Sequence, residues 1–278
     1  MIKYTEILFI LLLILTIPIN TQANETEKHP GIGRTILNDL DNSRRDILHI
    51  FANIEKFNTT ELLSYGGMIS GTVACMPFDE DFRNFTLKNH SPAADTYFNI
   101  HDEFGSVQGM SVIVGGSYLT GLIFNSEQLR VTGRLMFEAL LLSGLYVQKL
   151  KTTFGRSRPF TGDPANQFNW FESDNKNLSF PSGHTTGAFA IASVFALRYD
   201  KWWSYTIGYS LATGTALARV YKNHHWLSDV FLGACIGTLS GIAVVNVEKY
   251  FNNTQQKRIS RKLFIDIFPV GINFTYKL

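Results

Sequence analysis

The sequence predicts an all-α protein, a single helical bundle with a short β-hairpin at its C-terminus. Apolar residues recur at helical spacing in seven segments of the chain. These segments are rich in Gly, Ala, Ser and Thr, the small residues that let helices approach closely. No Gly/Ser/Pro-rich linker and no internal repeat interrupts the 278 residues, so one main domain is expected.

The N-terminus has the pattern of an export signal. Lys3 precedes an apolar run over residues 7–19, which ends in small and polar residues up to Ala23. The run is shorter than the roughly 20 residues that a comfortable membrane span needs. We expect residues 1–23 to be a cleaved signal peptide, and an uncleaved anchor is the alternative.

Residues 24–60 form the next predicted unit, an N-terminal amphipathic segment. Apolar residues follow a helical pattern over residues 35–57, with a break expected at 41–43. Such a helix packs on a core or lies on a membrane surface, and core packing is the commoner case.

The main domain is predicted over residues 61–250, and the remaining residues 251–278 are predicted to be a basic linker and tail. Within the tail, apolar and polar residues alternate after Pro269, which predicts a hairpin; a loosely packed end is the alternative. The helices expected in the main domain cover residues 62–76, 104–126, 139–148, 185–197, 202–218 and 230–247.

Composition excludes a nucleic-acid-binding protein. The formal net charge is only +2, and no basic run with interleaved aromatic residues lies near the motifs described below. The basic residues 257–262 are interpreted as a solvated or headgroup-facing segment. Cys75 and Cys235 could pair in an oxidising compartment, but both lie in apolar stretches, which favours free buried thiols.

The chemistry is expected to centre on Arg219-x5-His225-x3-Asp229. If the segment from His225 onward is helical, His225 and Asp229 share a face, and the carboxylate can hold the imidazole through Nδ1–H. Nε2 would then be free to attack or to take a proton, with Arg219 ready for an anion. His224 is the rival histidine, but it lies five residues from Asp229 and points off that face. A surface His/Asp pair beside an unrelated arginine is the alternative for this stretch taken alone.

Two further stretches supply an anion site. Lys151-x6-Arg158-Pro159 places two cations after an apolar segment, and Pro181-Ser182-Gly183-His184 precedes another. Ser182 can cap the following helix, and Gly183 lets the backbone approach a phosphate at the helix N-terminus. Each residue also has a plain structural interpretation, as helix punctuation, a cap or a helix-end charge.

Taken together, the three motifs resemble the signature of the type 2 phosphatidic acid phosphatase and vanadium haloperoxidase superfamily. The resemblance is close over residues 151–229, with one departure, Ala218, where the family usually has Ser. It implies the family's helical bundle and a phosphohistidine mechanism. His225 would be the nucleophile, Asp229 would fix its tautomer, and His184 would protonate the leaving alkoxide. The phosphate-binding residues would be Lys151, Arg158, Ser182, Gly183 and Arg219.

No metal or other cofactor is expected. Apart from the motif histidines, the sequence has no His/Cys/carboxylate cluster at ligand spacing, and three cations supply the charge that a magnesium ion would. Vanadate should inhibit as a mimic of the phosphoryl-transfer geometry.

The predicted function is an exported phosphatase for a phosphate monoester or diphosphate, most simply of a lipid. The resemblance offers phosphatidate, phosphatidylglycerophosphate, undecaprenyl diphosphate and lipid A phosphates as substrates. The alternatives are a soluble nonspecific acid phosphatase, a vanadium-dependent haloperoxidase and a non-catalytic protein that keeps the fold. The polar and aromatic loop between Pro159 and Pro181 is either a lid or substrate selector, or a passive surface loop.

The expected location is the periplasm, in association with the membrane. The mean hydropathy of +0.01 and the shortness of most apolar runs favour this over a fully polytopic protein. The alternative is an integral inner-membrane protein, because residues 104–126 and 230–247 are long enough to cross. The basic residues at 130, 134, 198 and 201 would then be cytoplasmic, and Lys151, His184 and His225 would share the outer side.

Overall fold

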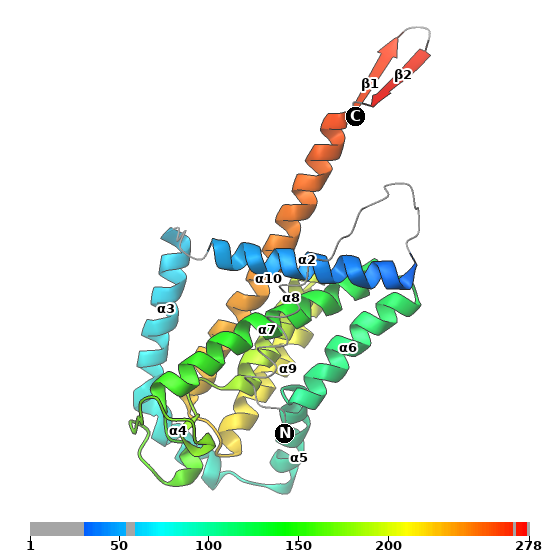
Figure 1. Ribbon diagram of the computed structural model, residues 1–278. Helices are drawn as coiled ribbons and strands as arrows, with labels where there is room; N and C mark the ends of the chain where they lie inside the picture. The colour runs from blue at the N-terminus through cyan, green and yellow to red at the C-terminus, as the bar shows by residue number, and fades with distance from the viewer. Residues whose placement is uncertain (1–30, 54–58, 269–270, 277–278) are drawn as a thin grey trace.

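The computed structural model describes residues 31–53, 59–268 and 271–276, and this part of the chain is almost entirely helical (Figure 1). The predicted all-α fold is thereby confirmed. The predicted signal peptide, residues 1–23, lies outside the described residues. The elements in chain order are α2 (Ile32–Ala52), α3 (Thr59–Cys75), η1 (Met76–Phe78), α4 (Asp79–Lys88), α5 (Pro92–Phe104), α6 (Val107–Ile123), α7 (Glu127–Phe154), η2 (Pro159–Thr161), η3 (Asn175–Asn177), α8 (Gly183–Tyr199), α9 (Trp202–Tyr221), α10 (Leu227–Lys262), β1 (Leu263–Phe268) and β2 (Gly271–Tyr276).

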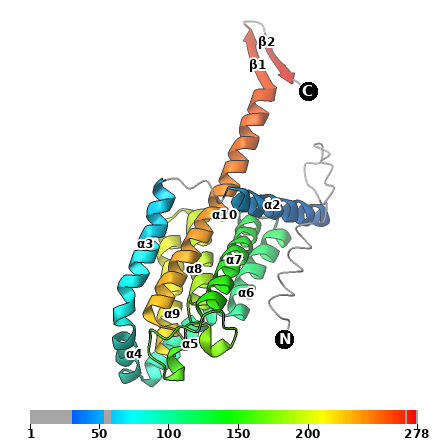
Figure 2. The ribbon, with the colours of Figure 1, turned by 60° about the vertical axis from the view of Figure 1, so that its left-hand side comes forward.

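The long helices run side by side, and α2 crosses one end of the bundle (Figures 1 and 2). The short helices α4 and α5 lie at the other end. The largest cluster of buried apolar residues lies between α7, α8 and α10 and includes Leu135, Ala139, Val194 and Val244. These three helices therefore form the rigid centre on which the ends of the bundle are built.

Small residues set the distance between α8 and α10. Gly233, Gly237 and Gly241 recur every fourth residue, so they share one face of α10. A Cβ atom added to Gly237 would lie 2.2 Å from the backbone oxygen of Thr186 on α8. The glycines thus bring the two backbones into contact, and this contact fixes where the first turns of α8 and α10 lie relative to each other.

The structure corrects several predicted helix boundaries. The segment 104–126 holds one helix, α6, which begins only after the cap Ser106, because Phe104 is the last residue of α5. Residues 77–103, where no helix was predicted, contain α4 and all of α5 but its last residue. The start of α5 is marked by the cap Ser91 and by Pro92 in its first turn. The predicted break in α2 at 41–43 is wrong, since α2 is continuous.

Charged residues inside the bundle explain why α7 and α10 are longer than predicted. The apolar run 139–148 is only the middle of α7, which has 28 residues, and α10 has 36 residues and crosses the predicted boundary at 250. Arg134 is buried and pairs with Glu138 at 2.8 Å, Asp46 of α2 at 3.0 Å and Glu248 of α10 at 2.7 Å. Because these charged side chains pair with one another, they can be buried within α7 and α10, and both helices continue beyond their apolar runs.

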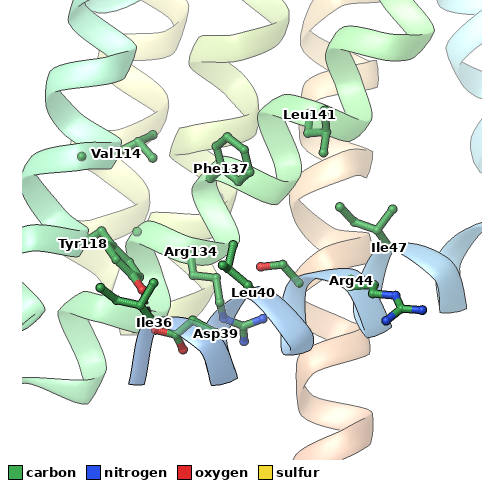
Figure 3. Close-up of a pocket in the computed structure, with 13 residues that line it drawn as sticks. Ile36, Asp39, Leu40, Arg44, Ile47, Val114, Tyr118, Arg134, Phe137 and Leu141 are labelled. Atoms are coloured by element: carbon green, nitrogen blue, oxygen red, sulfur yellow. Dashed lines mark hydrogen bonds between the residues drawn. The ribbon is translucent and has the colours of Figure 1, made fainter. Parts of the chain in front are cut away.

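The same charges hold α2 across the bundle. Beside them, a cavity of about 320 Å³ separates α2 from α6 and α7, with Leu40, Val114, Phe137 and Leu141 among the residues that line it (Figure 3). Asp39 at one side of this cavity accepts a hydrogen bond from Tyr118 at 2.8 Å and also pairs with Arg130. α2 is therefore held on the bundle mainly by Asp39 and Asp46, its only buried residues besides Ile47, while Leu37, Leu48 and Phe51 are exposed.

The C-terminal hairpin is also present. β1 and β2 are antiparallel, with Leu263 opposite Tyr276. The expected turn at residues 269–270 lies outside the described residues. Cys75 and Cys235 are both free. One described helix segment, Leu227–Thr254, is long and apolar enough to cross a membrane, and α5 with α6 would count as a second only as one segment bent by 53°.

Candidate active site

All three sequence motifs lie at the end of the bundle near α4 and α5, away from α2 (Figure 1). Lys151 is in the last turn of α7, and Gly155 ends that helix in a left-handed conformation, with φ +56°. His184 is in the first turn of α8, and Arg219 is in the last turn of α9. Asp229 is in the first turn of α10. Four helix ends therefore meet, which puts helix dipoles and side chains around one place.

Asp229 is fully buried and accepts hydrogen bonds on both carboxylate oxygens. Arg156 Nη1 donates to Oδ1 at 2.7 Å, while Ser179 Oγ donates to Oδ2 at 2.5 Å and the Trp226 N–H donates to Oδ2 at 2.9 Å. Burial alone would raise the pKa of Asp229, but the Arg156 charge and the hydrogen bonds from His225 and Ser179 hold it well below its usual range. Asp229 is therefore an ionised carboxylate with a fixed orientation.

His225 lies beside Asp229, although the local structure differs from the prediction. α10 begins at Leu227, so His225 precedes the helix and does not share a helical face with Asp229. The pair still meets, with Nδ1 of His225 at 3.5 Å from Oδ2 of Asp229 and 3.4 Å from Ser179 Oγ. These are long contacts, as catalytic hydrogen bonds often are without a ligand. Burial, opposed by the Asp229 hydrogen bond, lowers the pKa of His225 well below its usual value, so the ring is neutral.

The other nitrogen of His225 faces the cations. Arg158 Nη1 lies 3.4 Å from His225 Nε2. Two guanidinium nitrogens of Arg158 also bond the loop residue Asn175, one to its backbone oxygen at 2.8 Å and one to its side chain at 3.2 Å. The loop between the first two motifs thus helps to aim Arg158 at the position that a phosphoryl group on Nε2 would occupy.

Lys151 is buried and held against the loop before α8. Its Nζ donates to the backbone oxygens of Leu178 and, at 3.4 Å, Ser179. Burial, together with repulsion from Arg158, lowers the pKa of Lys151 to about 7. An anion placed beside this amine would restore its charge, because an adjacent negative charge favours the ammonium form.

Arg219 is oriented by an acidic partner. Its Nη1 lies 2.7 Å from Asp102 Oδ1, and Lys222 Nζ lies 2.8 Å from the other carboxylate oxygen. Asp102 is in the last turns of α5, so this short helix positions a cation of the site. Ala218, the departure from the family motif, is completely buried beside Arg219.

His184 shares the environment of the same cations as His225. Burial and the charge of Arg219 lower the pKa of His184 to about 4, with Lys151 and Arg158 adding to the effect and Asp102 opposing it. The two histidines therefore flank one cationic region. The ring of His224 lies edge-on to Phe160, with ring centroids 5.9 Å apart, and its backbone oxygen accepts from Arg158. Burial and the charges of Arg219 and Arg158 lower the pKa of His224 to about 4 as well, so this ring also lies near the cations.

Ser182 and Gly183 form the N-terminus of α8. Ser182 is the N-cap, and its hydroxyl accepts from the Thr185 N–H at 3.5 Å, so its oxygen is engaged within the helix. The space beside Gly183 is open, with Lys151 Cε the nearest atom to an added Cβ, at 3.9 Å. As the first helical residues, Gly183 and His184 have N–H groups without an intrahelical acceptor, which are available to an anion.

Four residues of the site were missed by the sequence analysis: Arg156, Ser179, Asp79 and Asp102. Arg156 lies between Lys151 and Arg158 of the first motif, Ser179 lies two residues before Pro181, and both contact Asp229. Asp79 and Asp102 belong to α4 and α5, where no helix was predicted. A usable signal was present for Arg156 only, as a third cation between Lys151 and Arg158. In the described residues, no group of three or more His, Cys, Asp or Glu side chains could hold a metal ion.

The loop between the first two motifs is anchored by aromatic packing. Phe154, Phe168, Trp170 and Phe180 have ring centroids 5.3 to 6.4 Å apart. Next to this cluster, Phe171 is 82% exposed. The loop thus has an aromatic base at the site, and the exposed Phe171 beside this base is tied to α7 by its N–H, which donates to the Thr153 oxygen at 3.1 Å.

Comparison with known proteins finds matches over this region. Residues 133–253 match the PAP2 superfamily. The chain is similar to lipid A 1-phosphatases from Porphyromonas gingivalis, with 41% identity over 105 residues (37% of this chain, 20% of the relative), and from Rhizobium johnstonii, with 32% identity over 108 residues (38% of this chain, 43% of the relative). The chain therefore spans less than half the length of either relative.

A solved structure resembles the fold. The crystal structure of the first transmembrane PAP2-type phosphatidylglycerolphosphate phosphatase from Bacillus subtilis aligns with a TM-score of 0.54 at 20% identity, over 68% of this chain and 96% of that one. The match of residues 133–253 agrees with the family predicted from the three motifs, and this structural likeness supports the predicted helical fold.

Proposed function

Residues 133–253 match the PAP2 superfamily, and from this premise we propose that the protein is a phosphatase that hydrolyses a lipid phosphate through a phosphohistidine. The observation that supports it best is the placement of His225. Asp229 lies behind Nδ1, and Nε2 faces Arg158, with Lys151 and Arg219 close by. A neutral imidazole with its free nitrogen among cations is what a nucleophile for a phosphate needs.

In the first step, His225 Nε2 attacks phosphorus while the bond to the leaving oxygen breaks. His184 gives its proton to that oxygen, so that the product leaves as an alcohol. The negative charge of the substrate favours the protonated form of His184, whose pKa is low in the empty site. Lys151, Arg158 and Arg219 stabilise the phosphoryl oxygens, as do the N–H groups at the start of α8.

In the second step, water attacks the phosphohistidine. His184, now neutral, takes a proton from the water, the P–N bond breaks, and inorganic phosphate leaves with His225 restored. No metal ion takes part in this scheme, and vanadate should inhibit as a mimic of the transition state.

The names of the relatives suggest the substrate class. The P. gingivalis and R. johnstonii proteins are named for removal of the 1-phosphate of lipid A. The outer faces of α3 and α6 also expose apolar side chains, such as Leu63, Ile69, Val112 and Ile123. Such surfaces suit contact with lipid, and we propose that the protein is exported and works at a membrane, with its site on the outer side.

The test compares three substrates with the full-length protein in detergent micelles: a lipid A 1-phosphate, phosphatidate and p-nitrophenyl phosphate. Hydrolysis of the lipids is expected to be faster, unchanged by EDTA, and absent in His225→Ala. Brief reaction with ³²P-labelled substrate should leave acid-labile label on the wild type and none on His225→Ala. Strong hydrolysis of p-nitrophenyl phosphate alone would contradict the lipid proposal and favour a nonspecific acid phosphatase.

A further inference from the structure

Arg156 is the most completely hydrogen-bonded side chain of the site. Its Nε and Nη2 donate to Ala165 O at 2.8 and 2.6 Å, Nη1 donates to Ser228 Oγ and Asp229 Oδ1, both at 2.7 Å, and Nη2 donates to Asp79 Oδ2 at 2.7 Å. These five bonds equal the number of N–H donors that a guanidinium has. The side chain is 1% exposed, so it has no donor left for a substrate.

Asp79 anchors this arginine to the start of α10. Besides Arg156, it accepts from the N–H of Ser228 at 2.8 Å and from the Ser228 hydroxyl at 2.7 Å. Since Ser228 lies in the first turn of α10, Asp79 caps that helix from α4. Asp79, Arg156, Ser228 and Asp229 thus form a closed network that joins α4, the loop after α7 and α10.

The network holds Oδ1 of Asp229, while Ser179 and the Trp226 N–H bond Oδ2, and together these contacts determine which way the carboxylate points. A carboxylate in the first turn of a helix can rotate about its side-chain bonds, and His225, which precedes α10, has no helical hydrogen bonds to hold its ring in place. Because Arg156 takes Oδ1, the other oxygen is left to face Nδ1 of His225. Rotation of Asp229 would break the 2.7 Å bond to Arg156, in a buried place where no water replaces it.

We propose that Arg156 and Asp79 are positioning residues of the catalytic histidine: the Asp79–Arg156 pair fixes Asp229, and Asp229 in turn selects the tautomer of His225 that leaves Nε2 unprotonated. The expected change in kcat rests on the proposed function. The expected change in the tautomer of His225 follows from the geometry alone.

The variants are Arg156→Met, which keeps an apolar chain between the surrounding rings, Arg156→Lys, which keeps the charge, and Asp79→Asn. We expect Arg156→Met to lower kcat about 100-fold with KM changed less than about threefold, as loss of a residue behind a catalytic ligand does. The kcat of Arg156→Lys should be at most about tenfold above that of Arg156→Met, because an ammonium group cannot reproduce the planar set of guanidinium donors. Asp79→Asn should lower kcat about tenfold. Asp81→Asn, an exposed position on the same helix, is the matched control and should leave kcat unchanged.

The direct readout is the tautomer of His225, from ¹⁵N spectra of histidine-labelled full-length protein without substrate. Its signal is identified by its loss in His225→Ala. The wild type should show the Nδ1–H form, and Arg156→Met should show the Nε2–H form in a substantial fraction, while the His184 signals stay unchanged.

Two results would overturn the proposal. One is an Arg156→Met protein with native thermal unfolding and a kcat within about threefold of the wild type. The other is a loss of kcat with an unchanged His225 tautomer. If Arg156→Met does not fold, the same criteria apply to Asp79→Asn. If the wild type hydrolyses no phosphate ester, the proposed function fails, and the tautomer comparison still decides the positioning role.

Discussion

The buried amine of Lys151 should make anion binding weaker as the pH rises, and the Lys151→Arg substitution should remove this dependence. With a pKa of about 7, this lysine is mostly neutral above pH 7 in the empty site, and a bound phosphate draws it back to the charged form. Binding at higher pH therefore requires uptake of a proton. Affinity should fall as pH rises, beginning near pH 7.

The size of the effect follows from the pKa. At pH 8 about one molecule in ten has Lys151 protonated, and at pH 9 about one in a hundred, which corresponds to a loss of about 1.4 and 2.7 kcal/mol in binding free energy. An arginine at this position would remain charged, because its guanidinium does not lose its proton in this range. The Lys151→Arg variant should thus bind more weakly at pH 6 through imperfect geometry, yet lose little further affinity up to pH 9.

The assay is competitive inhibition by inorganic phosphate, measured from pH 6 to 9 with wild type and Lys151→Arg. Titration of the phosphate itself is common to both proteins and cancels in the ratio of their inhibition constants. This ratio should change by roughly a hundredfold between pH 6 and 9. A ratio that stays constant would show that Lys151 is charged in the empty site, and the argument from its burial would be refuted.

Three further predictions concern stability. Arg134→Met should destabilise the protein by about 3–5 kcal/mol in chemical unfolding, because it leaves buried carboxylates without their partner. Gly237→Ala should cost at least about 1–3 kcal/mol through overlap with the α8 backbone. Gly144→Ala, where no atom lies within 4 Å, should be neutral or gain up to about 1 kcal/mol. His184 has a folded-state pKa of about 4, below its ordinary value of 6.5, so the unfolded chain binds the extra proton. The free energy of unfolding should therefore fall by at most about 3 kcal/mol as the pH drops from above 6.5 to 4. The His184→Gln variant should show a smaller fall over the same range.

The sequence predicts the parts of the site that depend on residue type and spacing. Lys151, His184, Arg219 and Asp229 all lie at helix ends, and helix ends are where phosphate-binding side chains and free N–H groups are expected. Their order along the chain is enough to indicate an anion site. The helices that bring them together are long apolar segments, which are the elements that periodicity identifies best.

The remaining parts depend on contacts between segments far apart in the chain. Asp79 is 77 residues from Arg156 and 149 from Ser228, so no local pattern could link them. The conditional expectation of a helix from His225 onward fails for a similar reason, because α10 begins at Leu227. Only Trp226 lies between His225 and that helix, and the pairing with Asp229 comes from the carboxylate folding back toward the Trp226 N–H at the helix start.

Two buried charge networks hold α10 at opposite ends of the bundle. Asp229 pairs with Arg156 at the catalytic end, and Glu248 pairs with Arg134 of α7 near α2. The two acidic residues are 19 positions apart, or about 28 Å along a helix. The glycine contacts between them set the separation of α10 from α8, and the two charge networks add a constraint on its position along its own axis. A slip of one turn, about 5.4 Å, would break both networks at once and leave buried charges unpaired. The charges near α2 therefore help to fix the position of α10 along its axis. This position in turn sets the distance between His225 and the cations supplied by the segments around α10.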